Sequence, residues 1–171
     1  MPVVEPSTRH TVIVTDLGAL TAVVDDVGLA GLYFPGHWTR PDPLAWGPRV
    51  ERDPVADRAA VQLGEYLTGA RTAFDVPLHL VGPDLGQRVW DRLRQIPFGS
   101  TTTYGALATA VGGTHARAVG HFVGANPVSV FVPCHRVVGA SGSLTGYAGG
   151  LDRKRRLLEL EGALVAPPSL F

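Results

Sequence analysis

The apolar residues in the first part of the chain fall in short runs that favour strands. Residues 10–16, 20–26 and 28–34 are rich in Val, Ile, Leu and Thr, with Gly between and within the runs. Runs of this kind predict a hairpin or meander of short antiparallel strands. Residues 74–80 form a similar run and predict one further short strand. The N-terminal region is therefore expected to contain a small antiparallel sheet.

A helix is predicted after these strands. Apolar side chains recur near helical spacing over residues 54–68, which is typical of an amphipathic helix. Asp53 has the side chain of an N-cap, and Pro54 suits the first helical position. Residues 35–48 are dense in Pro, Gly and Trp, so a loop is expected there. These features predict an α/β domain over residues 1–82.

From about residue 83 the apolar pattern becomes helical. Helices are predicted at residues 85–96, 101–112, 114–126 and 151–162. Asp152 is expected to cap the last helix and Gly162 to end it. Gly112 and Gly113 separate two short helices, which is the outline of a helix-turn-helix motif. The pattern predicts a second, mostly α-helical domain over residues 83–171.

The neutral net charge hides an asymmetry between the two halves of the chain. Residues 1–85 carry 6 Arg against 11 acidic residues, a net charge of −5. Residues 86–171 carry 9 basic against 4 acidic residues, a net charge of +5. A basic half beside an acidic half predicts one polyanion-binding face. Chance clustering of surface charge is the alternative.

Membrane, secretory and metal-dependent classes are disfavoured by the sequence. The apolar runs are shorter than the roughly 18 to 20 residues of a transmembrane helix, and the N-terminus lacks the regions of a signal peptide. The single cysteine excludes an intramolecular disulfide and a thiolate-rich zinc site within one chain. We therefore expect a cytoplasmic protein with a reduced thiol and with no metal or other cofactor.

The only cysteine, Cys134, stands between Pro133 and the basic residues His135 and Arg136. A thiol is a good nucleophile as its thiolate, and an imidazole can accept the proton while a guanidinium favours the anion. Neighbouring side chains point to opposite sides of an extended strand. Cys134 and His135 can therefore cooperate only if Pro133 turns the chain. A structural cysteine packed in its apolar run remains the alternative.

Several motifs surround this cysteine. They are Asn126-Pro127, residues 133–139 (PCHRVVG) and residues 141–151 (SGSLTGYAGGL), with residues 88–90 (RVW), 96–99 (IPFG), 103–105 (TYG) and 116–120 (ARAVG) upstream. At these spacings the motifs closely resemble those of the O6-alkylguanine-DNA alkyltransferases. The resemblance covers residues 83–163. The N-terminal half matches more loosely, at residues 17–21 and 31–34.

The resemblance implies a two-part fold and a chemical role for the cysteine. The N-terminal domain would be a ribonuclease H-like α/β fold, and the C-terminal domain would be winged-helix-like with a helix-turn-helix. Cys134 would accept an alkyl group from guanine O6, with His135 as the base, acting through a water polarised by Glu161. Asn126 would tie the helix-turn-helix to the cysteine turn. A thioether has no simple cellular reversal, so each molecule would act once and irreversibly.

The same resemblance assigns residues to the substrate and to DNA. The substrate-binding residues would be Tyr104, Tyr147, Val137, Ala148 and Gly149. Because O6 is stacked and paired in a duplex, the base must flip out, and Arg117 would fill the gap that it leaves. The further DNA-binding residues would be Ala116, Gly120, Thr103 and Arg136, of which Arg136 is expected chiefly to anchor the active-site turn. One or two of residues 153–156 would also face DNA.

The implied partner is double-stranded DNA containing O6-alkylguanine, bound through its minor groove. O4-alkylthymine as a second substrate and cooperative binding on DNA stay open, and a monomer is expected in solution. Two other functions remain as alternatives. A Cys-His hydrolase would turn over esters or amides. A DNA-binding regulatory or damage-recognition protein without chemistry would tolerate the loss of Cys134.

Overall fold

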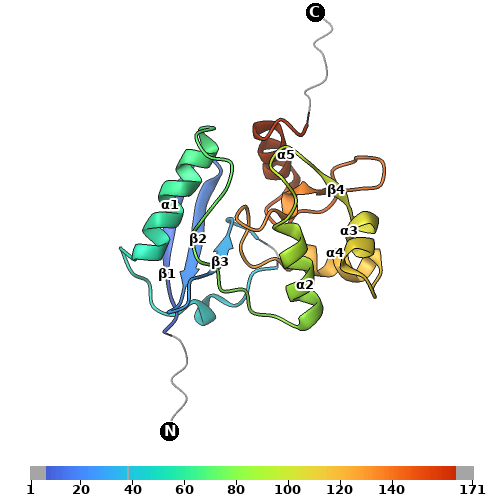
Figure 1. Ribbon diagram of the computed structural model, residues 1–171. Helices are drawn as coiled ribbons and strands as arrows, with labels where there is room; N and C mark the ends of the chain where they lie inside the picture. Colours follow the sequence, from blue (N-terminus) through green and yellow to red (C-terminus); the bar gives the residue numbers. More distant parts are fainter. Residues whose placement is uncertain (1–6, 38, 165–171) are drawn as a thin grey trace, which may run out of the picture. The chain divides into compact units, whose positions relative to one another are not determined.

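The computed structural model describes residues 7–37 and 39–164 (Figure 1). It divides into two compact units, each described below by itself. The first unit is Met1–Pro83 with Pro127–Phe131, and the second is Asp84–Asn126 with Val132–Phe171. Along the sequence, the short segment Pro127–Phe131 of the first unit thus follows α4 and precedes the cysteine turn of the second unit.

The first unit contains the expected antiparallel sheet. Its strands are β1 (Arg9–Thr15), β2 (Gly18–Val24) and β3 (Leu29–Tyr33), in the order β1-β2-β3. The β1–β2 hairpin pairs Val12 with Thr21 and closes at Thr15 opposite Gly18. The strand predicted at residues 74–80 was wrong, because only a single bridge between Leu29 and Leu78 forms there.

Helix α1 (Pro54–Leu67) lies alongside the sheet (Figure 1) and follows the predicted pattern. Asp53 caps it as expected, its Oδ1 accepting from the backbone N–H groups of Val55 at 2.9 Å and Ala56 at 3.0 Å. Ala59, Leu63 and Tyr66 form its buried face. The loop predicted before it contains one short 3₁₀ helix, η1 (Pro43–Trp46).

The segment Pro127–Phe131 is joined to the first unit through the last strand of the sheet. Leu32 of β3 donates its N–H to the carbonyl of Pro127 at 2.8 Å and accepts from the N–H of Ser129 at 3.2 Å. The Phe131 ring stacks on Phe74 with 4.1 Å between centroids. The chain that leads to the cysteine turn is therefore held by backbone bonds and by aromatic packing.

The second unit is mostly helical. Its elements are α2 (Asp84–Leu93), β4 (Thr102–Thr103), α3 (Tyr104–Val111), α4 (Ala116–Gly124), η2 (Cys134–Arg136), β5 (Val137–Val138) and α5 (Leu151–Leu160). The helix predicted from residue 101 starts later, because Thr102 and Thr103 pair with β5 as a parallel strand. Thr103 then caps α3 by accepting from Ala106 N–H at 3.1 Å.

Helix α5 (Leu151–Leu160) begins where the sequence predicted, but its N-cap lies two residues before the one expected. Its N-cap is Gly150, with φ of 93°, and Asp152 lies in the first turn. The prediction that Asp152 is the cap was wrong. The cap position has a positive φ, which glycine adopts without steric cost, so the helix starts after Gly150. The expected stop is confirmed, since Gly162 has φ of 71°.

Helices α3 and α4 form a tight pair that packs against α2. Gly112 and Gly113, with φ of 77° and 66°, make the turn between them. The Nη2 of Arg88 donates to the carbonyls of Val111 at 2.9 Å and Gly112 at 2.6 Å, satisfying carbonyls at the end of α3. The turn between α3 and α4 is therefore held by two glycines and one arginine.

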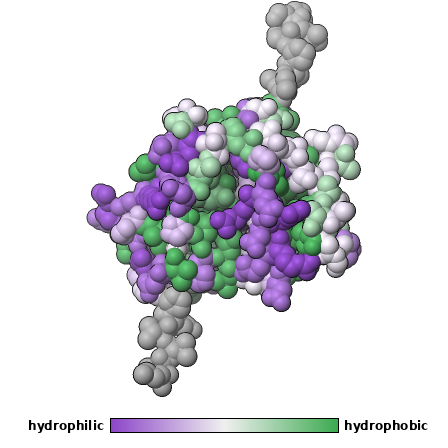
Figure 2. Space-filling view, viewed as in Figure 1, coloured by the Kyte–Doolittle hydropathy of each residue, from purple (hydrophilic) through white to green (hydrophobic). Residues whose placement is uncertain are grey.

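Polar and apolar side chains are interspersed on the face seen in Figure 2. The large hydrophobic residues that are exposed are scattered along the chain: Val14, Val27, Leu44, Val61, Val81 and Leu151. Single exposed apolar residues are normal on a folded protein. Hydropathy alone therefore marks no site, and the buried polar groups are more informative.

Candidate active site

The cysteine lies in a 3₁₀ turn, η2, rather than in a strand. Cys134 N–H bonds the carbonyl of Val132 at 2.8 Å, and Arg136 N–H bonds that of Pro133 at 3.0 Å. Because a 3₁₀ turn holds about three residues, consecutive side chains do not alternate as they would in a strand. All three side chains of the turn are buried. The turn at Pro133 that the sequence required is confirmed.

Glu161, at the C-cap of α5, binds two of these side chains at once. Its Oε2 lies 2.8 Å from His135 Nε2, and Arg136 donates to both carboxylate oxygens, from Nε and Nη2, at 2.8 Å each. Arg136 Nη1 also donates to the carbonyl of Ile96 at 2.7 Å. A buried carboxylate needs such pairing, and a two-pronged guanidinium contact is among the strongest available.

This arrangement places Arg136 inside the protein. Its donors are engaged by Glu161 and Ile96, and its side chain is almost fully buried. The anchoring role expected for Arg136 is thus the one that the geometry shows, whereas a DNA contact would require exposed donors. Glu161 also touches His135 directly, so its action does not have to pass through a water.

The motif at residues 96–99 closes around this ion pair. The Ile96 carbonyl accepts from Arg136, and the guanidinium carbon of Arg136 lies 5.9 Å from the Phe98 ring centroid. Gly99, with φ of 84°, approaches so closely that an added Cβ would sit 3.2 Å from the Glu161 carbonyl oxygen. Sequence reasoning matched this motif without finding its use, which is to enclose the buried charges.

The contact with Glu161 decides which nitrogen of His135 can act as a base. An ionised carboxylate only accepts hydrogen bonds, so the Nε2 that faces it carries the hydrogen. The second nitrogen, Nδ1, is then left with a lone pair, and it has no hydrogen-bond partner among the described residues. Burial lowers the pKa of His135, opposed by Glu161. The ring is therefore neutral in the resting protein, with a lone pair on Nδ1.

The Cys134 thiol is protonated in the resting protein. Burial raises the pKa of this thiol to about 11, against the opposing effects of the Asn126 amide and the Lys154 ammonium. Asn126 is buried as well, and its Nδ2 donates to the carbonyl of Val132 at 2.8 Å. The amide thus connects the end of the α4 region to the cysteine turn, as the sequence led us to expect. Reaction at the sulfur requires removal of a proton.

Lys154 is a site residue that sequence reasoning missed. It was treated as part of the charged run at residues 153–156, yet its side chain is 0% exposed. Its Nζ donates to the carbonyls of Val137 at 2.6 Å, Thr145 at 2.8 Å and Gly146 at 3.4 Å. A signal was available, because Lys154 shares a helix face with the apolar Leu157 and Leu158 three and four residues later.

The two tyrosines lie on different elements of the second unit. The Tyr104 hydroxyl, at the start of α3, donates to the Thr145 carbonyl at 3.4 Å. The ring also lies beside Gly120 of α4, where an added Cβ would be 3.6 Å from its Cδ1. Tyr147 is buried, as are the other residues expected around the substrate: Val137, Ala148 and Gly149.

The residues expected at DNA lie mainly at the start of α4. Ala116 and Arg117 are exposed in its first turn, which His115 caps by accepting from Ala118 N–H at 3.3 Å. Thr103 is partly exposed, with its hydroxyl engaged in capping α3. Arg117 is thus free of the buried network and can reach a ligand at the surface.

Within residues 7–37 and 39–164, no group of three or more His, Cys, Asp and Glu residues could hold a metal ion. In the same part of the chain, no helix combines the length and the apolar character needed to cross a membrane.

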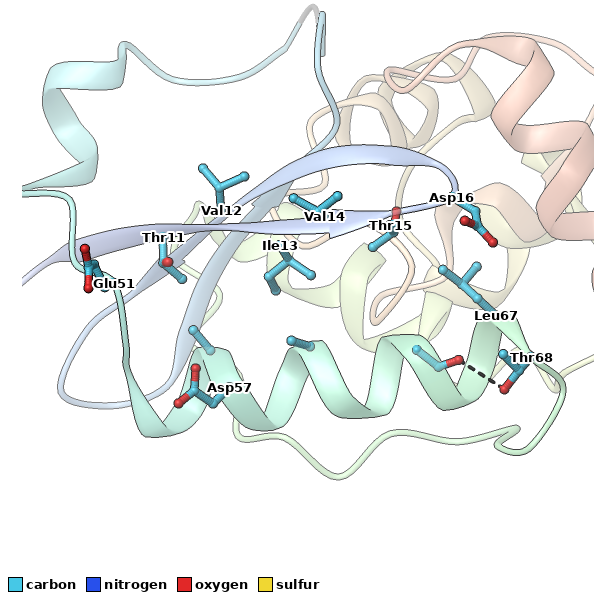
Figure 3. Close-up of a pocket in the computed structure, with 13 residues that line it drawn as sticks. Thr11, Val12, Ile13, Val14, Thr15, Asp16, Glu51, Asp57, Leu67 and Thr68 are labelled. Carbon is cyan, nitrogen blue, oxygen red and sulfur yellow. Dashed lines mark hydrogen bonds between the residues drawn. The ribbon is translucent and has the colours of Figure 1, made fainter.

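A groove in the first unit is not part of this site. It lies between β1 and α1 (Figure 3) and has a volume of about 400 Å³. Its lining includes Thr11, Ile13, Asp16, Glu51 and Asp57, but no cysteine and no histidine. Without a thiol or an imidazole it lacks the groups that distinguish the Cys134 turn.

The fold and the site define a class of protein before any comparison is made. A single buried thiol stands beside a neutral imidazole held by a carboxylate, in a helical unit with a glycine-turned helix pair. These are the parts of a thiol-dependent group acceptor joined to a helix pair of the kind that binds nucleic acid.

Comparison with known proteins identifies the family. Residues 84–163 match the family model described as 6-O-methylguanine DNA methyltransferase, DNA binding domain. The methylated-DNA–protein-cysteine methyltransferase of Mycobacterium tuberculosis is 52% identical over 126 residues, 73% of this chain and 70% of the relative. That of Methanosarcina acetivorans is 40% identical over 156 residues, 90% of this chain and 98% of the relative.

A solved structure agrees with this result. The crystal structure of Mycobacterium tuberculosis O6-methylguanine methyltransferase superposes with a TM-score of 0.81 at 43% identity, over 95% of this chain and 97% of that one. The chain belongs to the methylated-DNA–protein-cysteine methyltransferase family.

Proposed function

We propose that this protein repairs DNA by transferring an alkyl group from O6-alkylguanine to Cys134, once per molecule. The observation that carries the proposal is the series of contacts Cys134–Asn126 and His135–Glu161 around one buried thiol. Relatives at up to 52% identity are named methylated-DNA–protein-cysteine methyltransferases. The Mycobacterium tuberculosis relative has also been crystallised in complex with DNA, with a TM-score of 0.81 at 42% identity, over 91% of this chain and 93% of that one.

The proposed reaction is a displacement at the alkyl carbon. The thiol proton passes to Nδ1 of His135, through a bridging water, while Glu161 stabilises the imidazolium that forms. The sulfur then bonds to the alkyl carbon, and the C–O6 bond breaks with its electron pair passing to guanine. Guanine takes up a proton and leaves neutral. The thioether persists, because thiol exchange cleaves a disulfide but not the carbon–sulfur bond of a thioether.

We assign the substrate-binding residues to a pocket around the sulfur. Tyr104 and Tyr147 would approach the purine, and the Tyr104 hydroxyl is suited to donate a proton or hydrogen bond as charge develops on the base. Burial raises the pKa of Tyr104, so this hydroxyl stays protonated at neutral pH. Val137, Ala148 and Gly149 would complete the walls.

We assign DNA binding to the start of α4. Arg117 would occupy the space of the flipped nucleotide, and the small residues Ala116 and Gly120 would let the helix enter the minor groove. The partner would be duplex DNA carrying O6-alkylguanine, bound by a protein that is monomeric in solution. The exposure of Ala116 and Arg117 supports this assignment.

The finer description of the fold is also a proposal. A three-stranded antiparallel sheet with one helix supports a ribonuclease H-like N-terminal domain over residues 1–82, and the α3–α4 pair supports a winged-helix-like domain over residues 83–171. A reactive thiol also agrees with the reducing cytoplasm expected from the sequence.

The function can be tested by mass. The protein is incubated with duplex DNA containing O6-methylguanine, and the intact protein is weighed. We expect a gain of one methylene unit, localised to the Cys134 peptide and absent from Cys134→Ser. Continued product formation beyond one equivalent would indicate a hydrolase instead, and unmodified protein with unrepaired DNA would reject the alkyl transfer.

The role of Arg117 can be tested separately. Arg117→Ala should slow repair of duplex O6-methylguanine by roughly 10-fold or more, since it removes the group that replaces the flipped base. Its reaction with free O6-benzylguanine, which needs no flipping, should stay close to wild type. An equal loss on both substrates would remove the flipping role.

A further inference from the structure

Lys154 presents an energetic puzzle within the second unit. Burying an ammonium is costly unless a partner compensates its charge. Along the described residues 7–37 and 39–164, no carboxylate forms an ion pair with it, and its Nζ bonds three backbone carbonyls. Carbonyl dipoles satisfy its donors but leave a net positive charge inside the protein. Methionine would fill much the same space without that cost.

The other buried charges of the site cancel one another. Arg136 and Glu161 form a pair with two contacts, and His135 is neutral. Tyr104, whose hydroxyl shares the Thr145 carbonyl with Lys154, is neutral too. One positive charge, that of Lys154, therefore remains without an anion in the resting state.

The missing anion can form at Cys134. Lys154 lies on α5, which packs against the η2 turn that holds Cys134, and its Nζ bonds the carbonyl of Val137, the residue directly after that turn. In this position the ammonium opposes the rise in the pKa of the Cys134 thiol, and the sulfur opposes the fall in the pKa of Lys154. The same ammonium disfavours a proton on His135, as does Arg136. Loss of the thiol proton would thus turn an isolated buried cation into half of an ion pair.

We propose that Lys154 is a positioning residue for alkyl transfer: three carbonyls hold its ammonium in place as the fixed counter-charge of the Cys134 thiolate. The proposal deepens the proposed function and rests on it for the identity of the alkyl donor. It explains why a cation is buried here, and why its contacts are backbone carbonyls, which leave its charge available for the sulfur.

The pH dependence gives a specific signature. Burial lowers the pKa of Lys154 to about 8. The ammonium is therefore present at pH 7 and lost as the pH rises through that value. If Lys154 acts through its charge, its effect on the rate of Cys134 alkylation should be large at pH 7 and small at pH 9.5. If its role is purely structural, that effect should change little with pH.

The test uses the full-length protein and two alkylating agents. Free O6-benzylguanine reports the proposed reaction without DNA. Iodoacetamide reports the thiolate alone: the sulfur–carbon bond forms, iodide leaves, and the thiol proton passes to solvent. Because Cys134 is the only cysteine, intact mass measures both reactions, and Cys134→Ser gives the background.

We expect Lys154→Met to react about tenfold more slowly than wild type with both agents at pH 7, which corresponds to a shift of one pKa unit in the thiol. The difference should shrink towards none at pH 9.5. Arg94→Met, which removes one exposed charge from the same unit, is the matched control and should change neither rate without DNA. Lys154→Arg keeps its charge at all these pH values, so its rate relative to wild type should rise between pH 7 and 9.5.

Two results would overturn the proposal. One is a Lys154→Met rate equal to wild type at pH 7, or reduced by the same factor at every pH. The other, which does not depend on the folding of Lys154→Met, is a flat ratio between Lys154→Arg and wild type. If wild type reacts with iodoacetamide in the expected pattern but not with O6-benzylguanine, the inference on Lys154 is supported and the proposed function fails.

Discussion

Both units of the protein bury charged groups, but they use them differently. In the first unit, Asp53 accepts from Arg9 and caps α1, and Asp25 contacts His79 at 2.5 Å while binding backbone N–H groups. Every one of these groups has its partner in place. In the second unit the buried set includes a thiol, an imidazole nitrogen with no partner among the described residues, and an ammonium that bonds backbone carbonyls.

The comparison shows that burial of charge does not by itself mark a reactive site. The carboxylates of the first unit fix the ends of strands and helices, and their electrostatic needs are met in the resting state. At the Cys134 turn, by contrast, removal of the thiol proton would create the anion that the buried Lys154 ammonium lacks. The first unit also buries an imidazole without a hydrogen-bond partner among the described residues, that of His37. The Cys134 turn is therefore distinguished by a buried thiol, an unpartnered imidazole nitrogen and a buried ammonium in one unit.

The largest effect is expected from Glu161→Gln. Loss of the carboxylate leaves Arg136 uncompensated and frees the His135 ring, so alkyl transfer should fall by at least about 100-fold. The free energy of unfolding should fall by about 3 to 5 kcal/mol, since one partner of a buried pair is removed. Single-turnover kinetics and denaturant unfolding measure the two effects.

The matched control for this variant is Glu159→Gln, an exposed carboxylate on the same helix. It should change neither the rate nor the stability appreciably. A Glu161→Gln protein that kept both would show that the pairing in the second unit is as dispensable as a surface charge.

A smaller effect, on stability alone, is expected from Asp53→Ala. This change removes the cap of α1 and the partner of Arg9, and the loss of a cap costs about 1 to 2 kcal/mol. The rate of reaction with free O6-benzylguanine should stay at the wild-type value. Asp53→Asn keeps a capping oxygen, so it should recover part of the lost stability in urea unfolding.

The result for Asp53→Ala tests the comparison directly. If the folded variant reacted much more slowly with the free base, the charges of the first unit would belong to the reactive machinery after all.

The smallest effect concerns the pH dependence of stability at Asp25. Burial raises the pKa of this carboxyl, but His79 and two backbone N–H groups outweigh it, so the folded pKa lies below its ordinary value. Its contribution to stability is therefore present above the unfolded pKa and lost as the pH falls through the folded pKa. Asp25→Asn should be less stable than wild type at pH 7.

The difference in the free energy of unfolding between wild type and Asp25→Asn should narrow as the pH is lowered below the ordinary carboxyl pKa of 3.8. Urea unfolding at pH 7, 5 and 3 measures it, and a difference that widened with acid would have the wrong sign for a carboxylate paired in the folded state.

Much of the fold followed from local sequence pattern. The Asp53-Pro54 start of α1, the strand runs and the glycine pair between α3 and α4 are short-range signals, and the structure confirms them. The strand at residues 74–80 failed because a suitable run still needs a partner along its whole length. Asp152 was chosen as a cap by side-chain type, whereas the left-handed Gly150 decided the start of α5.

The site residues also divide into those that a sequence motif indicates and those that it does not. Cys134, His135 and Glu161 could be named from motifs, and the geometry shows His135 and Glu161 in direct contact. Lys154 could not be separated from its charged neighbours by composition, because its partners are carbonyls of residues 137, 145 and 146. Backbone partners carry no residue type, so no sequence motif records them.

The segment Pro127–Phe131 has a consequence for the independence of the two parts as folding modules. A fragment starting near residue 84 would contain the whole reactive turn but not Leu32 or Phe74, the partners of its residues 127, 129 and 131. Val128, Val130 and Phe131 are buried in the intact chain and would lose part of their cover. An evolutionary exchange of the first unit would therefore have to preserve a strand edge able to receive these five residues. A fragment cut near residue 84 would therefore need a new cover for these apolar side chains.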